Sequence, residues 1–234
     1  MENRSILMTP TEFSRESFLD LVSLSAGMAI ARQNAFGALI AERGGWNVDI
    51  RERTITFGDK AFSIGILGSE SEQSGTWLWG WANTEANIPE LANAASRRAK
   101  KALGACPEFS TGKFMLDELH NGHNIAMVSV GAAEKCSCYY RCPYNGGALF
   151  VQIENLPDEI FAPLDSTSFM RQYLEIISSF YCDHRLLAAG FLYQNGTEFS
   201  ENGGEIEAFF PDRTLVFSFE SAEGLCRVYN VSSK

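Results

Sequence analysis

The 234-residue sequence lacks the short motifs that identify common enzyme classes. A G-x-S-x-G elbow, a P-loop, a G-x-G-x-x-G loop and an H-E-x-x-H helix are all missing. Only three histidines are present, which leaves few ways to pair a nucleophile with a general base. The sequence therefore favours a protein without catalytic activity.

Long apolar segments are missing too. The most apolar early stretch, residues 17–31, is interrupted by Asp20 and is shorter than the roughly 20 apolar residues that span a bilayer. The first residues lack the apolar core of a secretory signal. We therefore expect a cytoplasmic protein that makes no membrane contact and keeps its six cysteines reduced.

Positive charge is scarce. Lysine and arginine number 19 against 29 aspartates and glutamates, so the formal net charge is −10. Nucleic-acid binding needs a basic surface, and we therefore expect no nucleic-acid partner. The acidity suits a solvated surface, with a basic protein partner as the alternative. The hydrophobic fraction of 45% is enough for a sizeable core in one large or two small domains.

The first part of the chain reads as a helix, a run of strands and further helices. Thr9, Pro10 and Glu12 form a helix-start signal, and the helical pattern continues to about Glu42. Its apolar residues surround almost the whole helix between residues 18 and 31, which predicts a buried helix. The period then changes to two. The predicted strands are 46–50, 53–57, 62–67 and 76–82, and the helices that follow are 87–103 and 113–135.

Strands return in the second part of the chain. The pattern predicts strands at 138–142, 148–153, 206–210, 213–219 and 225–231, with a helix at 169–180. We expect an α+β fold with antiparallel sheets packed on long helices, loosely like cystatin or NTF2 in element order. Residues 1–155 and 156–234 would form two parts packed as one compact unit.

Two segments of the sequence are weakly similar, which leaves an internal duplication open. Gly44-Gly45 leads through a short strand to Arg53-Thr54, and Gly203-Gly204 leads through another to Arg213-Thr214. The two parts could therefore be related lobes, each a helix followed by a strand meander.

Three of the four tryptophans occupy alternate positions, at Trp77, Trp79 and Trp81. On a strand they would share one face, and the opposite face, with Leu78 and Gly80, is also apolar or small. Packing in the core is favoured over an aromatic binding surface. If the stretch does bind a ligand, the candidate residues are Trp77, Trp79, Trp81, Asn83 and Trp46.

The stretch GTWLWGWAN at residues 75–83 resembles the TW-x-W-x-W-x-N signature of an uncharacterised bacterial protein family, a domain of unknown function. Residues 46–49, 54–57, 140–141 and 146–147 are similar to that family as well. The resemblance covers about residues 11–155, and the tryptophan motif is its specific part. It implies a bacterial source and a shared fold, and it transfers no catalytic residue.

Cysteine and histidine could in principle bind a metal. The possible ligands for a structural zinc are Cys136, Cys138, Cys142, Cys182 and His184. Their spacing is not that of paired C-x-x-C knuckles, and free cysteine is commonly a buried residue. We therefore favour core thiols and expect no metal and no cofactor. His120 and His123, three residues apart, are the remaining partners for a thiol.

Other charged groups read as solvated surface. The basic cluster Arg97-Arg98-Lys100-Lys101 and the carboxylate pairs of Glu205 with Glu207, Asp117 with Glu118 and Asp158 with Glu159 fit exposed faces. The favoured function is a non-enzymatic binding module for a protein or a small apolar ligand, with the oligomeric state open. The alternatives are an acidic immunity-type protein that neutralises a basic toxin, and a hydrolase with a thiol or zinc site.

Overall fold

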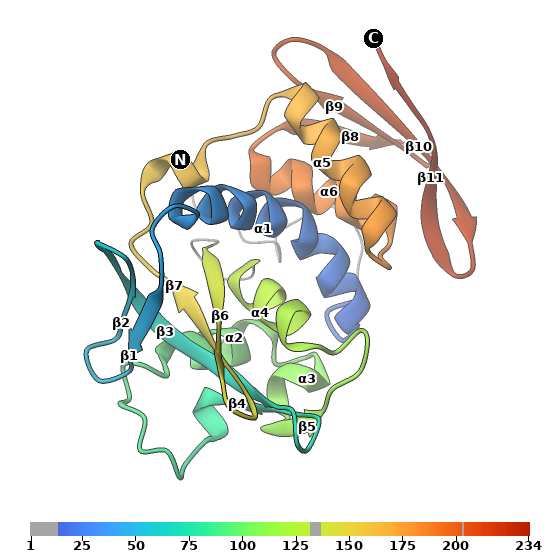
Figure 1. Cartoon of the computed structure of the whole chain (residues 1–234). Helices are drawn as coiled ribbons and strands as arrows, with labels where there is room; N and C mark the ends of the chain where they lie inside the picture. Colours follow the sequence, from blue (N-terminus) through green and yellow to red (C-terminus); the bar gives the residue numbers. More distant parts are fainter. Residues whose placement is uncertain (1–13, 132–136, 203) are drawn as a thin grey trace.

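A computed structural model describes residues 14–131, 137–202 and 204–234, and its fold is α+β with antiparallel sheets, as predicted (Figure 1). The helices are α1 (Phe18–Ile40), α2 (Ala94–Leu103), α3 (Pro107–Ser110), α4 (Gly122–Gly131), α5 (Ser166–Ser179) and α6 (His184–Asn195), with 3-10 turns at Gly80–Ala82 and Asp158–Phe161. The strands are β1 (Trp46–Asp49), β2 (Thr54–Phe57), β3 (Lys60–Ser71), β4 (Thr76–Trp79), β5 (Lys113–Met115), β6 (Cys138–Tyr144), β7 (Gly147–Ile153), β8 (Glu198–Asn202), β9 (Glu205–Phe209), β10 (Thr214–Ala222) and β11 (Leu225–Ser233). The predicted helix start at Thr9 to Glu12 lies outside the described residues.

The long strand β3 organises the first sheet. Its first half pairs with β2, its second half pairs with β4, and β7 lies along its other side. The strand order is β1-β2-β3-β4-β5, and β7 and β6 continue from β3. All of these pairs are antiparallel. The connection that we predicted at the polar residues 69–74 is therefore partly wrong, because Ser69–Ser71 still belong to β3.

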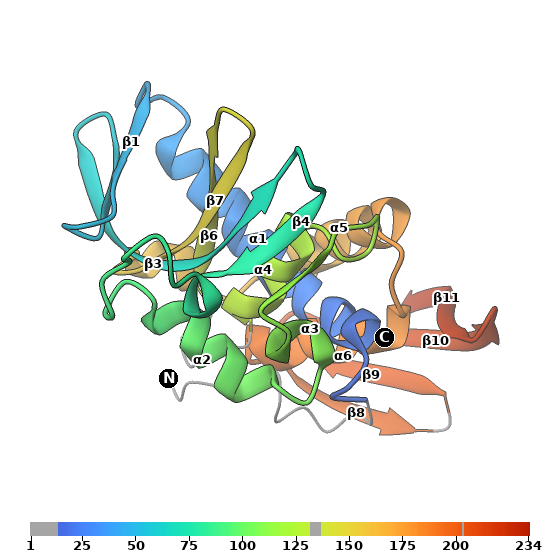
Figure 2. The same cartoon turned by 90° about the horizontal axis from the view of Figure 1, so that it is seen from below.

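The helix α1 lies between the two sheets (Figure 2). All nine residues from Leu21 to Ala29 are buried, as the apolar pattern predicted. Ser17 caps the helix by accepting the Asp20 backbone N–H at 3.2 Å. One side of α1 packs on α4 and the other side on α6. A single apolar cluster therefore reaches from Trp77 in the first sheet to Phe217 in the second.

The C-terminal sheet has the order β11-β10-β9-β8 and is covered by α5 and α6. Aromatic rings join these layers: the centroid of the Phe169 ring in α5 lies 4.2 Å from that of Phe191 in α6 and 5.3 Å from that of Phe210, just after β9. Alternation of Leu215, Phe217 and Phe219 along β10 places apolar groups toward the helices, as the period of two predicted. The residues of this sheet, of α5 and α6, and of α1 therefore belong to one apolar cluster.

Several predicted elements are wrong in position. The helix predicted at 87–103 begins only at Ala94, because Asn87 adopts a left-handed φ of 45° and the chain turns before α2. The helix predicted at 113–135 is instead strand β5, a turn and α4, with residues 132–135 outside the described part. The Asp117 carboxylate accepts the backbone N–H groups of Leu119 and His120 and thereby forms that turn.

Candidate functional site

The tryptophan strand lies in the core. Trp77 and Trp79 are 0% exposed, and their rings meet edge to face at 5.3 Å. The Trp79 indole N–H donates to the Glu108 carbonyl at 2.7 Å, whereas the Trp77 indole N–H has no partner among the described groups. A ligand could not reach either ring without opening the first sheet away from α1 and α4.

The predicted strand at 76–82 is wrong at its end, because β4 stops at Trp79. Gly80 begins a 3-10 turn whose backbone packs on α2: a Cβ at Gly80 would lie 2.6 Å from Asn93 Oδ1. Trp81 therefore lies outside the strand that holds the other two tryptophans and is only partly buried, and the Lys100 ammonium lies 3.6 Å from the centroid of its ring. Asn83 ends the turn and accepts the Ala86 N–H at 3.2 Å.

Trp46 lies elsewhere. It begins β1 and meets the Tyr140 ring at 5.7 Å, in a second apolar cluster that is separate from the one containing Trp77 and Trp79. The structure therefore does not gather the five candidate ligand residues into one pocket.

The possible zinc ligands are separated as well. Cys138 and Cys142 lie in the second apolar cluster, Cys182 in the first, and Cys136 is outside the described residues. Within the described part of the chain, no three histidine, cysteine, aspartate or glutamate side chains are arranged to hold a metal ion. Burial raises the pKa of Cys142 and of Cys182 to about 12, so both thiols are protonated at neutral pH and are weak nucleophiles.

His120 is held between two carboxylates. Its Nδ1 lies 2.9 Å from Asp117, its Nε2 lies 3.2 Å from Glu108, and its ring stacks on Phe18 at 5.0 Å. Cys106 donates to the other Glu108 oxygen at 2.9 Å, and burial, followed by this hydrogen bond, raises the pKa of the thiol. The arrangement ties the loop before α4 to α3, and the neutral thiol supplies no nucleophile.

His123 lies beside a partly buried ion pair. Its Nδ1 is 3.1 Å from the Tyr139 hydroxyl, and Arg141 binds Glu70 at 2.6 Å nearby. Burial lowers the pKa of His123 and raises that of Tyr139 to about 12. Both groups are therefore neutral at pH 7, and the Arg141 guanidinium is already bound to a carboxylate.

The third histidine binds the C-terminal hairpin. Strand β11 has one extra residue, Tyr229, opposite the Ser218–Phe219 step of β10. Before this bulge, the outward backbone N–H of Cys226 donates to Asp183 at 2.7 Å, and that of Val228 donates to His184 Nδ1 at 3.2 Å. The N-terminus of α6 therefore covers the first half of the β11 edge.

The second half of that edge is open. Thr214 and Lys234 exchange both of their backbone hydrogen bonds. Because such exchange recurs at every second residue of an antiparallel pair, Ser232 also faces β10, and Val231 and Ser233 turn their N–H and C=O groups away from the sheet. Since β11 ends the strand order, no described strand pairs with these groups.

The other edge strands of the described chain are protected in familiar ways. Strands β1 and β5 have only four and three residues. On β6, the Gln33 side chain binds both the N–H and the C=O of Tyr139, and Pro143 has no N–H to donate. Strand β8 carries Glu198 and Glu201. The segment from Tyr229 to Ser233 has no charge and no proline.

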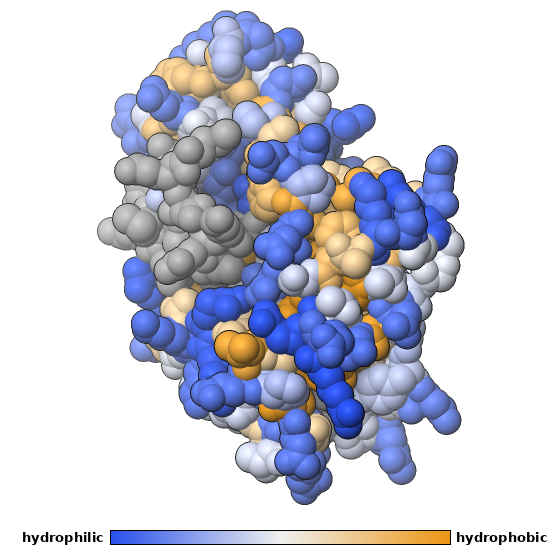
Figure 3. Space-filling view, turned by 90° about the vertical axis from the view of Figure 1, so that its left-hand side faces the viewer, coloured by the Kyte–Doolittle hydropathy of each residue, from blue (hydrophilic) through white to orange (hydrophobic). Residues whose placement is uncertain are grey.

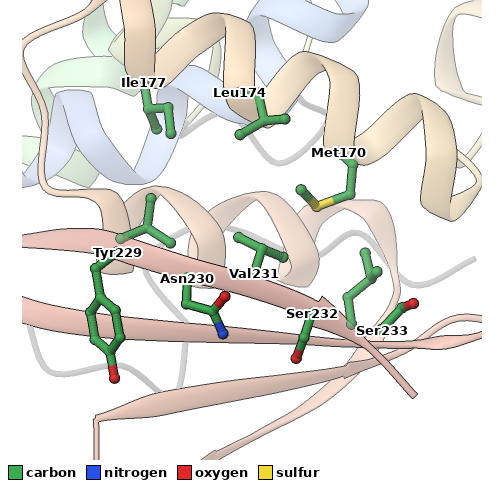
Figure 4. Close-up of a pocket in the computed structure, with 10 residues that line it drawn as sticks. Met170, Leu174, Ile177, Tyr229, Asn230, Val231, Ser232 and Ser233 are labelled. Carbon is green, nitrogen blue, oxygen red and sulfur yellow. The ribbon is translucent and has the colours of Figure 1, made fainter.

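An apolar groove of about 520 Å³ adjoins this open edge (Figure 4). Met170, Leu174 and Ile177 extend from α5 toward β11, and Val231 points back toward them. Leu174 is 49% exposed and Tyr229 is 64% exposed. Because α6 rather than α5 makes the main helix contact with β11, α5 overhangs space in which a further strand could lie. We call Met170, Leu174, Ile177 and residues 229–233 the edge groove.

Several of the remaining charged groups have partners inside the chain. Arg97 binds Glu90 at 2.7 Å, Arg98 binds Glu154 at 3.2 Å, and Lys100 lies on Trp81. Glu207 binds Lys234 at 2.6 Å, and Glu205 accepts the Ser218 hydroxyl at 2.8 Å. On the side of the molecule seen in Figure 3, hydrophobic residues lie among hydrophilic ones, as on an ordinary solvated surface.

A family model matches residues 19–156 and is described as a family of unknown function, DUF6882. The chain belongs to that family. The matched region runs from α1 to just past β7, so the edge groove lies beyond it. No curated protein and no solved structure matches the chain. None of the helices in the described ranges combines the length and apolar character that crossing a membrane requires.

The edge groove was not among the residues that the sequence singled out. Its one sequence signal is the uncharged stretch 228–233 at the end of a predicted strand. Whether a strand lies at the edge of a sheet depends on strand order, which one sequence does not reveal.

Proposed function

We propose that the chain is a protein-interaction module that binds an extended polypeptide segment along the edge groove. The observation that carries the proposal is the open backbone edge at Val231 and Ser233, next to an apolar groove. An added strand would pair with these backbone groups, and its alternate side chains would enter the space beneath α5. The backbone pairing would supply affinity, and the contacts with Leu174 and Met170 would supply selectivity.

The chemistry of the three histidine sites supports a binding role over a hydrolytic one. His120 has both ring nitrogens within 3.2 Å of carboxylates, and His184 accepts the Val228 N–H at Nδ1. The buried thiols of Cys142 and Cys182 are protonated at neutral pH. The proposal includes a bacterial source and a cytoplasmic location for the protein.

A photocrosslinking amino acid at position 174 tests the proposed function. In cells that make the protein, the reagent should attach a polypeptide to the edge groove, and mass spectrometry should identify the attached segment. The matched control is the same reagent at Leu91, which is 68% exposed and lies before α2. Equal labelling from both positions, or no polypeptide attached from position 174, would rule out the edge groove as a binding surface.

The outer face of the C-terminal sheet favours a second candidate, a basic protein partner. Cross-strand pairing places Glu198 beside Phe209, and Glu205 and Glu207 lie on the same face. Phe209 is 45% exposed among these carboxylates. This surface fits the immunity-type alternative. Replacing Glu198 and Glu205 by lysine should abolish capture of such a partner, while Leu174→Lys should leave it intact.

A further inference from the structure

We propose that the occupant of the edge groove is a second copy of this chain, joined by antiparallel pairing of the two β11 strands about a two-fold axis. The inference rests on the proposed function and names its partner. Val231 of each copy would pair with Ser233 of the other, so that the two-fold axis passes beside Ser232.

The open backbone groups are complementary to a copy of themselves. Val231 and Ser233 each present one N–H and one C=O, and antiparallel pairing of 231 with 233 satisfies all of them in both copies. A two-fold axis always brings a surface against the same surface. An edge suits this arrangement only if its N–H and C=O groups are complementary to those of the same edge in a second copy. The alternation of outward groups along β11 meets that condition.

Side chains near the axis do not oppose this pairing. Residues 229–233 are Tyr, Asn, Val, Ser and Ser, so no like charges meet across the two strands. Strand β8, at the opposite edge of the same sheet, carries two carboxylates, Glu198 and Glu201. The two β11 edges would join the sheets into one, with α5 of both copies above the junction.

The apolar side chains of the groove gain burial from the same arrangement. Leu174 is half exposed in the single chain, and the partner strand would lie beneath it and beneath Met170 and Ile177. The removal of apolar surface from water favours association, and the backbone hydrogen bonds of the uncharged edge fix the relative orientation of the two strands. Both contributions come from the residues that the single chain leaves open.

Sedimentation across a range of protein concentrations tests self-association. The expected species has twice the chain mass of 25.9 kDa. Leu174→Lys should weaken the dimer by about tenfold or more, because it places a cation in the apolar part of the interface. Leu91→Lys, the same substitution at a more exposed leucine, should leave the dimer unchanged. A wild-type protein that stays monomeric at its highest soluble concentration would overturn the inference.

Val231→Pro tests the backbone pairing. Proline removes an outward N–H that makes no bond to β10, and proline is tolerated on sheet edges. The variant should remain folded by circular dichroism and become monomeric. If it fails to fold, the Leu174→Lys result and the crosslink described next decide the question. A folded Val231→Pro variant that dimerises like the wild type would contradict pairing at this edge.

A cysteine at Ser232 tests the position of the axis. Residues opposite each other in a pair without hydrogen bonds have Cα atoms about 4.5 Å apart, which is within disulfide range. Ser232→Cys should therefore form a disulfide-linked dimer under mild oxidation. Ser200→Cys, an exposed serine on the opposite edge strand β8, is the control and should not. A crosslink from position 200 with none from position 232 would place the dimer interface at β8 and would contradict pairing through β11.

Salt separates self-association from capture of a basic partner. Each copy carries a formal charge of −10, so salt should screen the repulsion between copies and leave the dimer as tight or tighter. Binding of a basic segment should weaken as salt rises. If the chain is monomeric but the photocrosslinker at position 174 captures a different protein, the proposed function stands and the second copy is excluded. If position 174 captures nothing, both proposals fail.

Discussion

Gly190 in α6 packs directly against the backbone of Leu24 in α1, and a Cβ at position 190 would overlap the Leu24 carbonyl oxygen. A Cβ at Gly27 in α1 would overlap the side chain of Phe191 in α6. These two glycines let the helices approach closely at the point where the core passes from one sheet to the other.

Gly190→Ala should therefore destabilise the whole protein. The overlap is with backbone, which no change of rotamer relieves, so we expect a loss of about 3 kcal/mol or more in the free energy of unfolding. Urea denaturation measures it. The control is Gly37→Ala in α1, where nothing lies within 4 Å of the added Cβ and helix propensity predicts a gain of about 0.5–1 kcal/mol. Similar effects at the two positions would contradict the close helix contact.

The two buried tryptophans should respond differently to phenylalanine. Trp79→Phe leaves the Glu108 carbonyl without its donor, whereas the Trp77 indole N–H has no described partner to lose. We expect Trp79→Phe to cost about 1–3 kcal/mol more than Trp77→Phe, because both changes remove similar volume. Denaturation of the two variants, followed by circular dichroism, measures the difference. Equal losses would show that the hydrogen bond contributes nothing net.

Asp183 should be the most sensitive helix cap in the second part of the chain. Its carboxylate accepts the N–H groups of Arg185 and Leu186 at the start of α6 and that of Cys226 in β11. Asp183→Ala should lower the free energy of unfolding by at least about 2 kcal/mol, since it removes a cap and leaves the Cys226 N–H unpaired.

Asp165 provides the matched comparison for that cap. It caps α5 through the Ser168 N–H, and no hydrogen bond joins it to a strand of the described chain. Asp165→Ala should cost clearly less than Asp183→Ala. Hydrogen exchange at the Cys226 and Val228 amides should also accelerate in the Asp183 variant alone. Protection of these two amides that did not change would mean that α6 does not cover the edge.

Stability should fall below pH 6.5 because of His184. Burial, followed by the nearby Arg227 charge, lowers the pKa of the folded imidazole below its value in the unfolded chain, which is about 6.5. The unfolded state therefore binds the proton more readily. The contribution of neutral His184 is complete above about pH 6.5 and is lost as the pH falls through the folded pKa. Each unit of pKa difference corresponds to about 1.4 kcal/mol.

His184→Gln separates this effect from other titrations. Burial also lowers the pKa of His123, so the wild-type curve contains both contributions. Urea unfolding at pH 7.5 and pH 5.5 should show a larger loss of stability in the wild type than in His184→Gln. The same loss in both proteins would show that His184 does not titrate in this range.

The sequence pattern predicted the elements whose apolar residues face the core at a regular spacing or in a continuous run. The β6–β7 hairpin and strands β9 to β11 are rich in apolar residues and have glycine or proline in their turns, and their predicted positions are close to the observed ones. The helix α5 was predicted for the same reason, because Phe169, Tyr173 and Ile176 recur on one face and are buried. Local pattern and tertiary environment agree in these segments.

Prediction failed where a polar side chain or a tertiary contact decides the structure. The Asp117 turn interrupts a segment that otherwise has a helical composition. The helix α6 was not predicted, because it is buried on nearly every side, and its apolar residues show no single face. The edge groove depends on strand order and on the position of α5, which are properties of the assembled chain.

The burial of α1 on both sides has an evolutionary consequence. The DUF6882 match ends at residue 156, before α5 and α6, although α6 covers residues of α1 that lie inside the match. A relative that ended there would expose Leu24 and Gly27 to water. Such a relative should carry polar residues at these positions, or should cover them with another chain. Substitution at these two positions would therefore indicate which family members have lost or replaced the C-terminal sheet.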